Sequence, residues 1–176
     1  MGQFLTAVFE IVAAPRLRCN GKLTAFIVSF AICLTAKAGG LPDSLQTPGA
    51  IDPAVTQENI GQTICVPGYT KTVRPPTPYT NRIKREQLDT YYKGQGEMRS
   101  VELDHLIPLT AGGHPSSTEN LWPQTYGGEY DASYKDRCEV ATGKAICQGR
   151  VGLVEAQKGF SVNWIEWCKQ LTGDTQ

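Results

Sequence analysis

The chain has 176 residues, of which 40% are hydrophobic and 19% charged, and its formal net charge is zero. This composition is typical of a globular protein and excludes a disordered chain. The length is enough for one domain with additional segments. Because the charge is balanced, overall charge does not indicate a nucleic-acid-binding protein.

Residues 1–38 have the segment order of a secretory signal peptide. Three basic residues between positions 16 and 22 precede an apolar run at 23–34, and Ala36-Lys37-Ala38 supplies small residues for cleavage. The run is short for a bilayer span, so we expect export to the periplasm or the medium without a stable membrane span. The alternative is an N-terminal membrane anchor that is retained.

The remaining chain predicts an arm followed by one domain. Residues 39–59 contain three prolines and little apolar periodicity, which is typical of a linker or disordered arm. Residues 60–172 then predict a single domain with room for a modest core.

Four cysteines remain after residue 38, and an even number in an exported chain predicts disulfides. Cys138 and Cys168 lie on the apolar faces of two predicted helices that must pack on the same small core. This favours a Cys138–Cys168 pair and leaves Cys65–Cys147, although the sequence alone allows other pairings.

The predicted elements before residue 100 are short. Residues 60–68 predict a strand, and residues 69–79, rich in proline, predict an extended polyproline-like segment. Thr80 can cap a helix over residues 81–92.

The second half of the chain predicts two strands and then helices. Residues 99–104 and Leu121-Trp122 predict strands separated by a loop. Helical spacing of apolar residues predicts helices over 129–142, 149–157 and 161–171, the first of them ended by Gly143.

An acid and a histidine lie side by side in the first of these strands. Asp104 and His105 stand in an otherwise apolar run, and Asn120 follows fifteen residues after the histidine. Histidine can take a proton from water near neutral pH, and a carboxylate suits Mg²⁺. In a regular strand the two side chains point to opposite faces, so a strand end or a bulge is needed to bring both to one site.

These residues resemble a nuclease motif. The stretch Leu103–Leu109, then Gly112-Gly113 and Asn120-Leu121, is similar to that of HNH endonucleases of the ββα-metal (His-Me finger) class. Of the two, bacterial exported HNH-signature proteins resemble the chain more closely, and this resemblance extends over about residues 60–168. Further matching stretches are 65–69, 73–76, 79–82, 120–124, Lys135-Asp136 with Glu139, 156–157 and 163–164.

The resemblance implies a fold and a role for several residues. The fold would be α+β, with a small ββα-metal core and additional packed helices. His105 would be the general base, Asp104 a metal ligand, and Asn120 the residue that orients the histidine. The metal would be Mg²⁺, with Mn²⁺ or Zn²⁺ as alternatives.

The chain departs from the motif at its last residue. The helix position at which the family often has a histidine is Glu129 here, and no histidine follows His114. Glu129 is therefore the first candidate for the second metal ligand, and Asp136 is the second candidate.

A basic stretch precedes the central unit. Residues 71–85 hold no acid, and basic residues here and on the later helix are candidates for phosphate contacts: Arg74, Arg82, Lys84, Arg85 and Lys135. The alternative for the stretch is an ordinary solvated surface, and Lys135 with Glu139 could form a surface ion pair.

The sequence thus predicts a divalent-metal-dependent endonuclease that acts on DNA, with RNA as a second substrate class. The alternative is an exported, disulfide-braced module that binds nucleic acid or protein on the same scaffold without turnover. The missing helix histidine favours this alternative. The sequence does not predict an oligomeric state.

Overall fold

The computed structural model describes residues 41–174, and the predicted signal peptide lies outside the described residues. In chain order the elements are η1 (Ile60–Gln62), α1 (Tyr69–Val73), α2 (Thr77–Asp89), β1 (Val101–His105), η2 (Leu109–Ala111), β2 (Leu121–Thr125), α3 (Ala132–Cys147) and α4 (Leu153–Thr172). The described chain is therefore α+β, as the sequence predicted at this coarse level.

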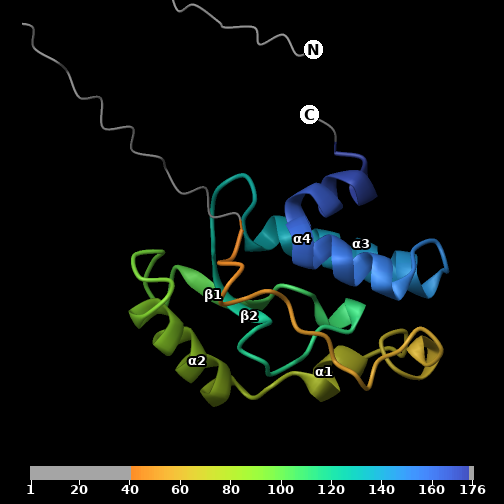
Figure 1. Ribbon diagram of the computed structural model, residues 1–176, viewed down its shortest axis with the longest axis horizontal. Coiled ribbons are helices and arrows are strands. Elements are labelled where there is room, and N and C mark those ends of the chain that lie inside the picture. The colour runs from red at the N-terminus through yellow and green to blue at the C-terminus, as the bar shows by residue number, and fades with distance from the viewer. Residues whose placement is uncertain (1–40, 175–176) are drawn as a thin grey trace, which may run out of the picture. The chain divides into compact units, whose positions relative to one another are not determined.

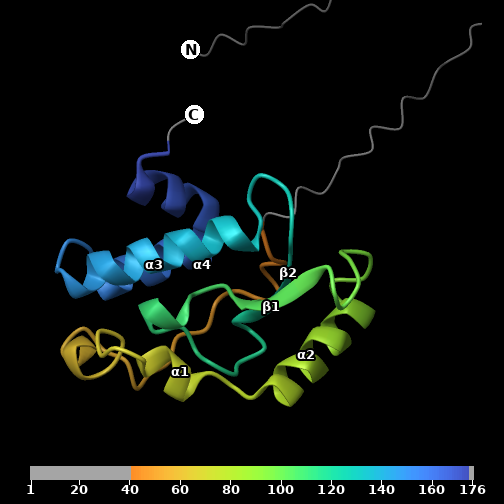
Figure 2. The ribbon, with the colours of Figure 1, turned by 180° about the vertical axis from the view of Figure 1, so that it is seen from behind.

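The two strands form an antiparallel sheet between two layers of helix. Val101 pairs with Thr125 at one end of the sheet, and His105 pairs with Leu121 at the other. Figures 1 and 2 show α2 on one side of the strands and α3 with α4 on the other. Asp104 and Trp122 are paired directly across the two strands, so their side chains lie on the same face of the sheet. This face is the one toward α3, because Asp104 contacts Lys135 of that helix.

Residues 41–59 pack against the domain, so the linker prediction is wrong for the described part of that segment. Thr47 and Val55 are buried. The Gly49 amide donates to the Glu119 carbonyl, and Ile51 forms an isolated bridge with Gly113. The prolines and glycines shape an irregular segment whose backbone groups bond to the domain, which composition alone does not distinguish from a free linker.

The segment before β1 is more helical than predicted. Residues 60–68 form η1 and turns rather than a strand, and α1 replaces the first part of the predicted polyproline segment. Helix α2 begins at Thr77, three residues before the predicted cap Thr80. Pro78 fits into its first turn, because the amide hydrogen that proline lacks would have no partner within the helix there.

Helix α3 begins at Ala132, where the Asp131 side chain accepts the Tyr134 amide, and it continues through Gly143. The predicted end at Gly143 is wrong. A Cβ at this position would lie 3.0 Å from Cβ of Thr110, so the glycine permits close approach of α3 to the loop between the strands.

The two predicted C-terminal helices are the two halves of α4, which is broken at Asn163 (φ −162°, ψ 92°). The Asn163 side chain accepts the Glu166 amide and so begins the second half. The Trp167 ring packs directly on Gly159, where a side chain would overlap it.

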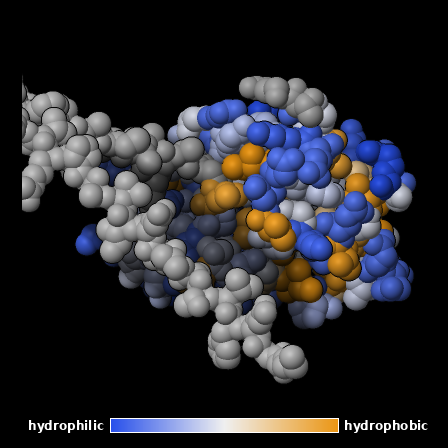
Figure 3. All heavy atoms as spheres, turned by 45° about the horizontal axis from the view of Figure 1, so that its top comes forward, coloured by the Kyte–Doolittle hydropathy of each residue, from blue (hydrophilic) through white to orange (hydrophobic). Residues whose placement is uncertain are grey.

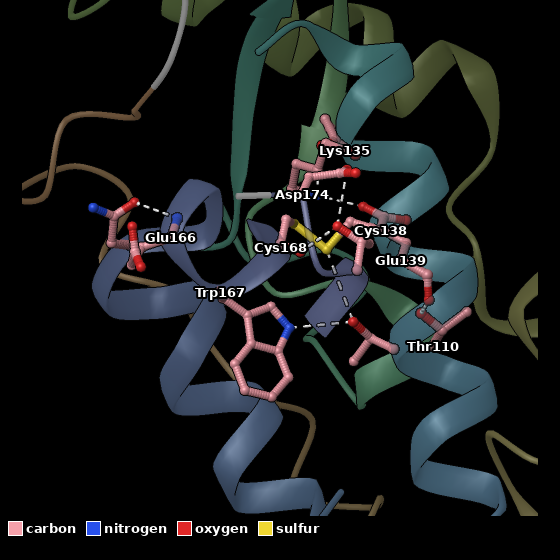
Figure 4. The surroundings of a disulfide bond; sticks show 12 residues. Thr110, Lys135, Cys138, Glu139, Glu166, Trp167, Cys168 and Asp174 are labelled. Carbon is pink, nitrogen blue, oxygen red and sulfur yellow. Dashed lines mark hydrogen bonds and ion pairs between the residues drawn. A yellow bond between two sulfur atoms is a disulfide. The ribbon is translucent and has the colours of Figure 1, made fainter. Parts of the chain in front are cut away.

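Two disulfides hold the helical layer together, and they are the pairs that the sequence favoured. Cys138–Cys168 joins α3 to α4 in the core, and Cys65–Cys147 joins the segment before α1 to the end of α3. Figure 4 shows the Cys138–Cys168 bridge between the two helices, with Lys135 and Glu139 nearby on α3. Two disulfides fit an oxidising location outside the cytoplasm.

The surface in Figure 3 has its apolar residues in small groups among hydrophilic ones. Val140, Val154 and Val162 are exposed apolar side chains on α3 and α4. Isolated exposed apolar residues are ordinary on a soluble surface. Within residues 41–174, no helix is both long and apolar enough to cross a membrane.

The two disulfides should differ in their access to reductant. Cys147 is exposed, whereas Cys138 and Cys168 are 1% and 0% exposed. We expect mild reductant to open Cys65–Cys147 first, as measured by alkylation and mass spectrometry of the native protein. The same treatment in urea is the control and should label all four cysteines. Equal labelling of both pairs without urea would contradict the buried position of Cys138–Cys168.

Candidate functional site

The candidate site lies where β1 ends. The loop of residues 106–120 leaves β1, returns to β2, and faces α3 through η2. Asp104 and His105 are both buried at this end, with exposed fractions of 9% and 4%. The site therefore combines a strand end, a long loop and a helix that covers them.

The His105 ring is fixed by one hydrogen bond to the loop. Nε2 lies 2.9 Å from the Pro115 carbonyl oxygen. A carbonyl can only accept, so Nε2 carries the proton, and in the neutral ring Nδ1 holds a lone pair. No atom within residues 41–174 makes a hydrogen bond to Nδ1, which is left to accept a proton.

The environment of His105 favours the neutral ring. Burial lowers its pKa below the ordinary value, while the Pro115 bond and the charge of Asp104 oppose this shift. The positive charges of Arg74 and Lys135 lower the pKa further. His105 is therefore uncharged near neutral pH and can act as a base.

Asn120 holds the loop closed rather than touching the histidine. Its Oδ1 accepts the Ile107 amide at 2.9 Å, and its Nδ2 donates to the carbonyls of Ile107 and His114 at 3.0 Å each. Since Pro115 follows His114, Asn120 orients the histidine indirectly. Gly113 completes this closure, because any side chain there would overlap the Ile107 carbonyl.

Asp104 has hydrogen-bond partners at both carboxylate oxygens. Oδ1 accepts the His105 amide at 2.7 Å, and Oδ2 lies 2.7 Å from Nζ of Lys135. The ammonium of Lys135 also donates to the His105 carbonyl at 2.6 Å and forms a short contact with Glu139. Lys135 is 0% exposed, so it is enclosed by these three oxygen partners.

The charges of this group influence one another strongly. Burial alone would lower the pKa of Lys135, but Asp104 and Glu139 raise it above the ordinary value, so the ammonium stays charged. Burial raises the pKa of Glu139 to about 8, against the opposing charge of Lys135. Burial favours a low net charge for the cluster of Asp104, Lys135 and Glu139 as a whole.

Further polar side chains surround the accessible side of Asp104. The Tyr126 hydroxyl donates to Glu102 at 2.8 Å. Burial and the charge of Asp104 raise the pKa of Glu102 and of Asp136, and Arg74 lowers that of Asp136. The sequence interpretation missed Glu102 and Tyr126; the signal for Glu102 was its position two residues before Asp104, on the same strand face.

Three of the predicted site residues do not lie where their predicted roles require them. Glu129 is exposed before α3, and its charge acts on Lys169. Lys135 is buried, so the prediction of a phosphate contact there is wrong. Lys84 donates to the carbonyls of Met98 and Val101 at 2.7 and 2.9 Å, which engages its ammonium in the fold.

The remaining predicted phosphate ligands differ in availability. Arg82 pairs with Glu86 at 3.1 Å on the surface of α2. Arg85 is exposed on the same helix. Arg74 is exposed, and it is the basic residue of the stretch whose charge acts on both His105 and Asp136.

The fit of a divalent ion can be tested on these residues. Within residues 41–174, no three His, Cys, Asp or Glu side chains are arranged to hold a metal ion. Mg²⁺ commonly keeps several waters and uses one or two carboxylates together with substrate phosphate. Burial and the charge of Asp104 raise the pKa of Asp136, so these two carboxylates influence each other and are the candidates for such a hydrated ion.

Comparison with protein-family models, curated proteins and solved structures found no match for this chain. The family therefore stays an expectation from the motif.

Replacing Asn120 should destabilise the domain. Asn120→Ala removes three hydrogen bonds and leaves buried backbone groups without partners, at a cost of about 2 to 4 kcal/mol in the free energy of unfolding. Urea denaturation would measure it. The exposed neighbour Glu119 is the control, since Glu119→Gln should change the value by less than about 0.5 kcal/mol. Equal stability of the two variants would show that the loop does not depend on Asn120.

Proposed function

We propose that the chain is a divalent-metal-dependent endonuclease of the HNH type that hydrolyses phosphodiester bonds of DNA, with RNA as a second substrate class. One observation supports this above the others. His105 is a buried, neutral imidazole with Nε2 bonded to the Pro115 carbonyl and Nδ1 left without a partner within residues 41–174. This is the arrangement that a general base needs.

The ββα-metal class is part of the same proposal. The order β1, loop 106–120, β2 and α3 supports it, together with the loop closure by Asn120. The motif residues of the strand end and of the loop lie close together, as a nuclease of this class requires.

In the proposed reaction, Nδ1 of His105 takes a proton from water, and the water oxygen forms a bond to the phosphorus atom. The bond from phosphorus to the leaving sugar oxygen breaks, and this oxygen takes a proton from solvent. The Pro115 carbonyl keeps the ring in the required tautomer and orientation. Arg74, exposed beside His105, binds a phosphate oxygen and offsets the negative charge of the substrate.

A divalent ion, when held by Asp104 and Asp136, would stabilise charge on the phosphate and on the leaving oxygen. Mg²⁺ is the first candidate, with Mn²⁺ or Zn²⁺ as alternatives. Glu129 is left out of this proposed ligand set, because it is exposed before α3 and is not among the charged groups that shift the pKa of Asp136. The acidic surroundings of Asp104 also explain why a phosphodiester would need a cation there.

We also propose that the protein is exported. The motif at residues 1–38 and the two disulfides support this proposal. An enzyme of this kind would meet DNA or RNA in the periplasm or in the medium.

One observation favours the second candidate function, an exported binding module without turnover. Lys135 already neutralises Asp104, which weakens the attraction of that carboxylate for a metal ion. Metal-dependent cleavage separates the two functions, because the module would bind its partner and leave phosphodiester bonds intact.

His105→Gln should abolish most of the cleavage. Glutamine can still donate a hydrogen bond to the Pro115 carbonyl but cannot act as a base, so we expect a fall of about 10² to 10⁴-fold. The measurement is nicking of supercoiled plasmid by the oxidised protein with Mg²⁺, Mn²⁺, Zn²⁺ or chelator.

His114→Asn is the matched control for this variant. His114 accepts the Ser116 and Ser117 amides through Nδ1, and the asparagine oxygen can replace that acceptor. The control should keep its cleavage. Cleavage by His105→Gln at the wild-type rate would contradict the assignment of His105 as the base. If the folded wild type cleaves with none of the metals, the binding module is favoured.

Arg74→Ala should weaken binding to nucleic acid in a salt-dependent way. The logarithm of the binding constant falls linearly with the logarithm of the salt concentration. Loss of one phosphate contact makes this slope less steep by about one. Arg82→Ala is the control, since Arg82 is already paired with Glu86. Fluorescence anisotropy with a labelled oligonucleotide would measure both variants over a salt series. The same change in both slopes would argue against a specific role for Arg74.

A further inference from the structure

We infer that Lys135 is a positioning residue: its buried ammonium fixes the peptide of His105 and the carboxylate of Asp104, and so holds the base at the end of β1 in place. This inference rests on the proposed function only for its effect on catalysis. Its structural part can be tested without any measurement of cleavage.

The contacts of Lys135 all converge on the strand end. Nζ lies 2.6 Å from the carbonyl oxygen of His105 and 2.7 Å from Oδ2 of Asp104, and Glu139 supplies a third oxygen from the next turn of α3. A lysine ammonium has three hydrogens to donate, and each has an acceptor here.

The peptide groups of His105 are therefore bonded by side chains on both sides. Asp104 accepts the His105 amide hydrogen through Oδ1, and Lys135 donates to its carbonyl. The two side chains are themselves joined by their ion pair. Movement of Lys135 would thus disturb three bonds that determine where the His105 backbone lies.

Two other roles fit the contacts less well. A phosphate contact needs solvent access, and Lys135 is 0% exposed. A purely stabilising role is also a poor explanation, because a buried ion pair seldom stabilises a fold more than apolar residues of the same volume. A function that needs one defined backbone position explains the location of the charge.

The test compares Lys135→Met/Glu139→Gln with Glu139→Gln alone. Methionine keeps the aliphatic length of lysine, and glutamine avoids a second unpaired carboxylate in the core. The single variant is the matched control, because it keeps the bonds of Lys135 to Asp104 and to the His105 carbonyl.

The readout is nitrogen NMR of the two histidine rings at one alkaline pH, where the spectrum reports the tautomer of each neutral ring. The chain contains only His105 and His114, so His114 is an internal reference. We expect wild type and Glu139→Gln to show the Nε2–H form of His105, because Nε2 donates to the Pro115 carbonyl. The double variant should show a mixture of tautomers.

The effect on catalysis is measured in parallel. In the double variant the His105 ring is no longer held in one position, which should lower kcat by about 10²-fold with little change in KM. If no variant cleaves nucleic acid but the His105 tautomers differ as expected, the proposed function fails and the positioning role stands. Identical tautomers in the single and double variants would overturn the inference.

A measurement on the wild type covers the case in which the double variant does not fold. The ammonium of Lys135 should give an NMR signal that exchanges slowly with water, because it is buried with three acceptors. A rapidly exchanging ammonium at this position would also overturn the inference.

Discussion

The arrangement of the candidate site depends on one buried charge. Moving an ammonium from water into a protein interior costs several kcal/mol, so the surroundings of Lys135 must supply acceptors for all of its hydrogens. They are supplied by the side chain of Asp104, the carbonyl of His105 and the side chain of Glu139. Because two of the three belong to β1, this requirement fixes α3 against the end of the strand.

The rest of the helical layer keeps α3 in that position. Cys138 lies one turn from Lys135 and is bonded to Cys168 on α4. Gly143 lets the same helix approach the loop between the strands at Thr110. The disulfide and the close packing thus hold α3 at the distance that the ammonium needs, and the break in α4 lets its second half remain over α3.

The sequence predicted the parts of this site that are close together in the chain. Asp104 and His105 were found because they interrupt an apolar strand, and Asn120 because it follows them at the spacing of the HNH motif, although the structure gives it a role in loop closure that was not predicted. The strand pair and α3 were predicted from apolar spacing. Lys135 was expected to contact phosphate, with a surface ion pair to Glu139 as the alternative, and both interpretations wrongly place it in contact with water.

Burial explains most of what the sequence could not predict. Whether the side of α3 that carries Lys135 faces water depends on where the helix packs, and no local pattern records that. Residues 41–59 show the same limit: their prolines and glycines are typical of a linker, yet Thr47 and Val55 are buried against distant parts of the chain. Composition describes a segment alone, whereas packing depends on its neighbours.

The buried ammonium also affects where a metal ion could act. The space between Asp104 and Glu139 already holds a fixed positive charge, so a second cation there would meet repulsion. On the other side of Asp104, burial and the charge of Asp104 raise the pKa of Glu102 and of Asp136, whereas Lys135 lowers both. The divalent ion that we propose would therefore meet less repulsion beside Asp136 than beside Glu139.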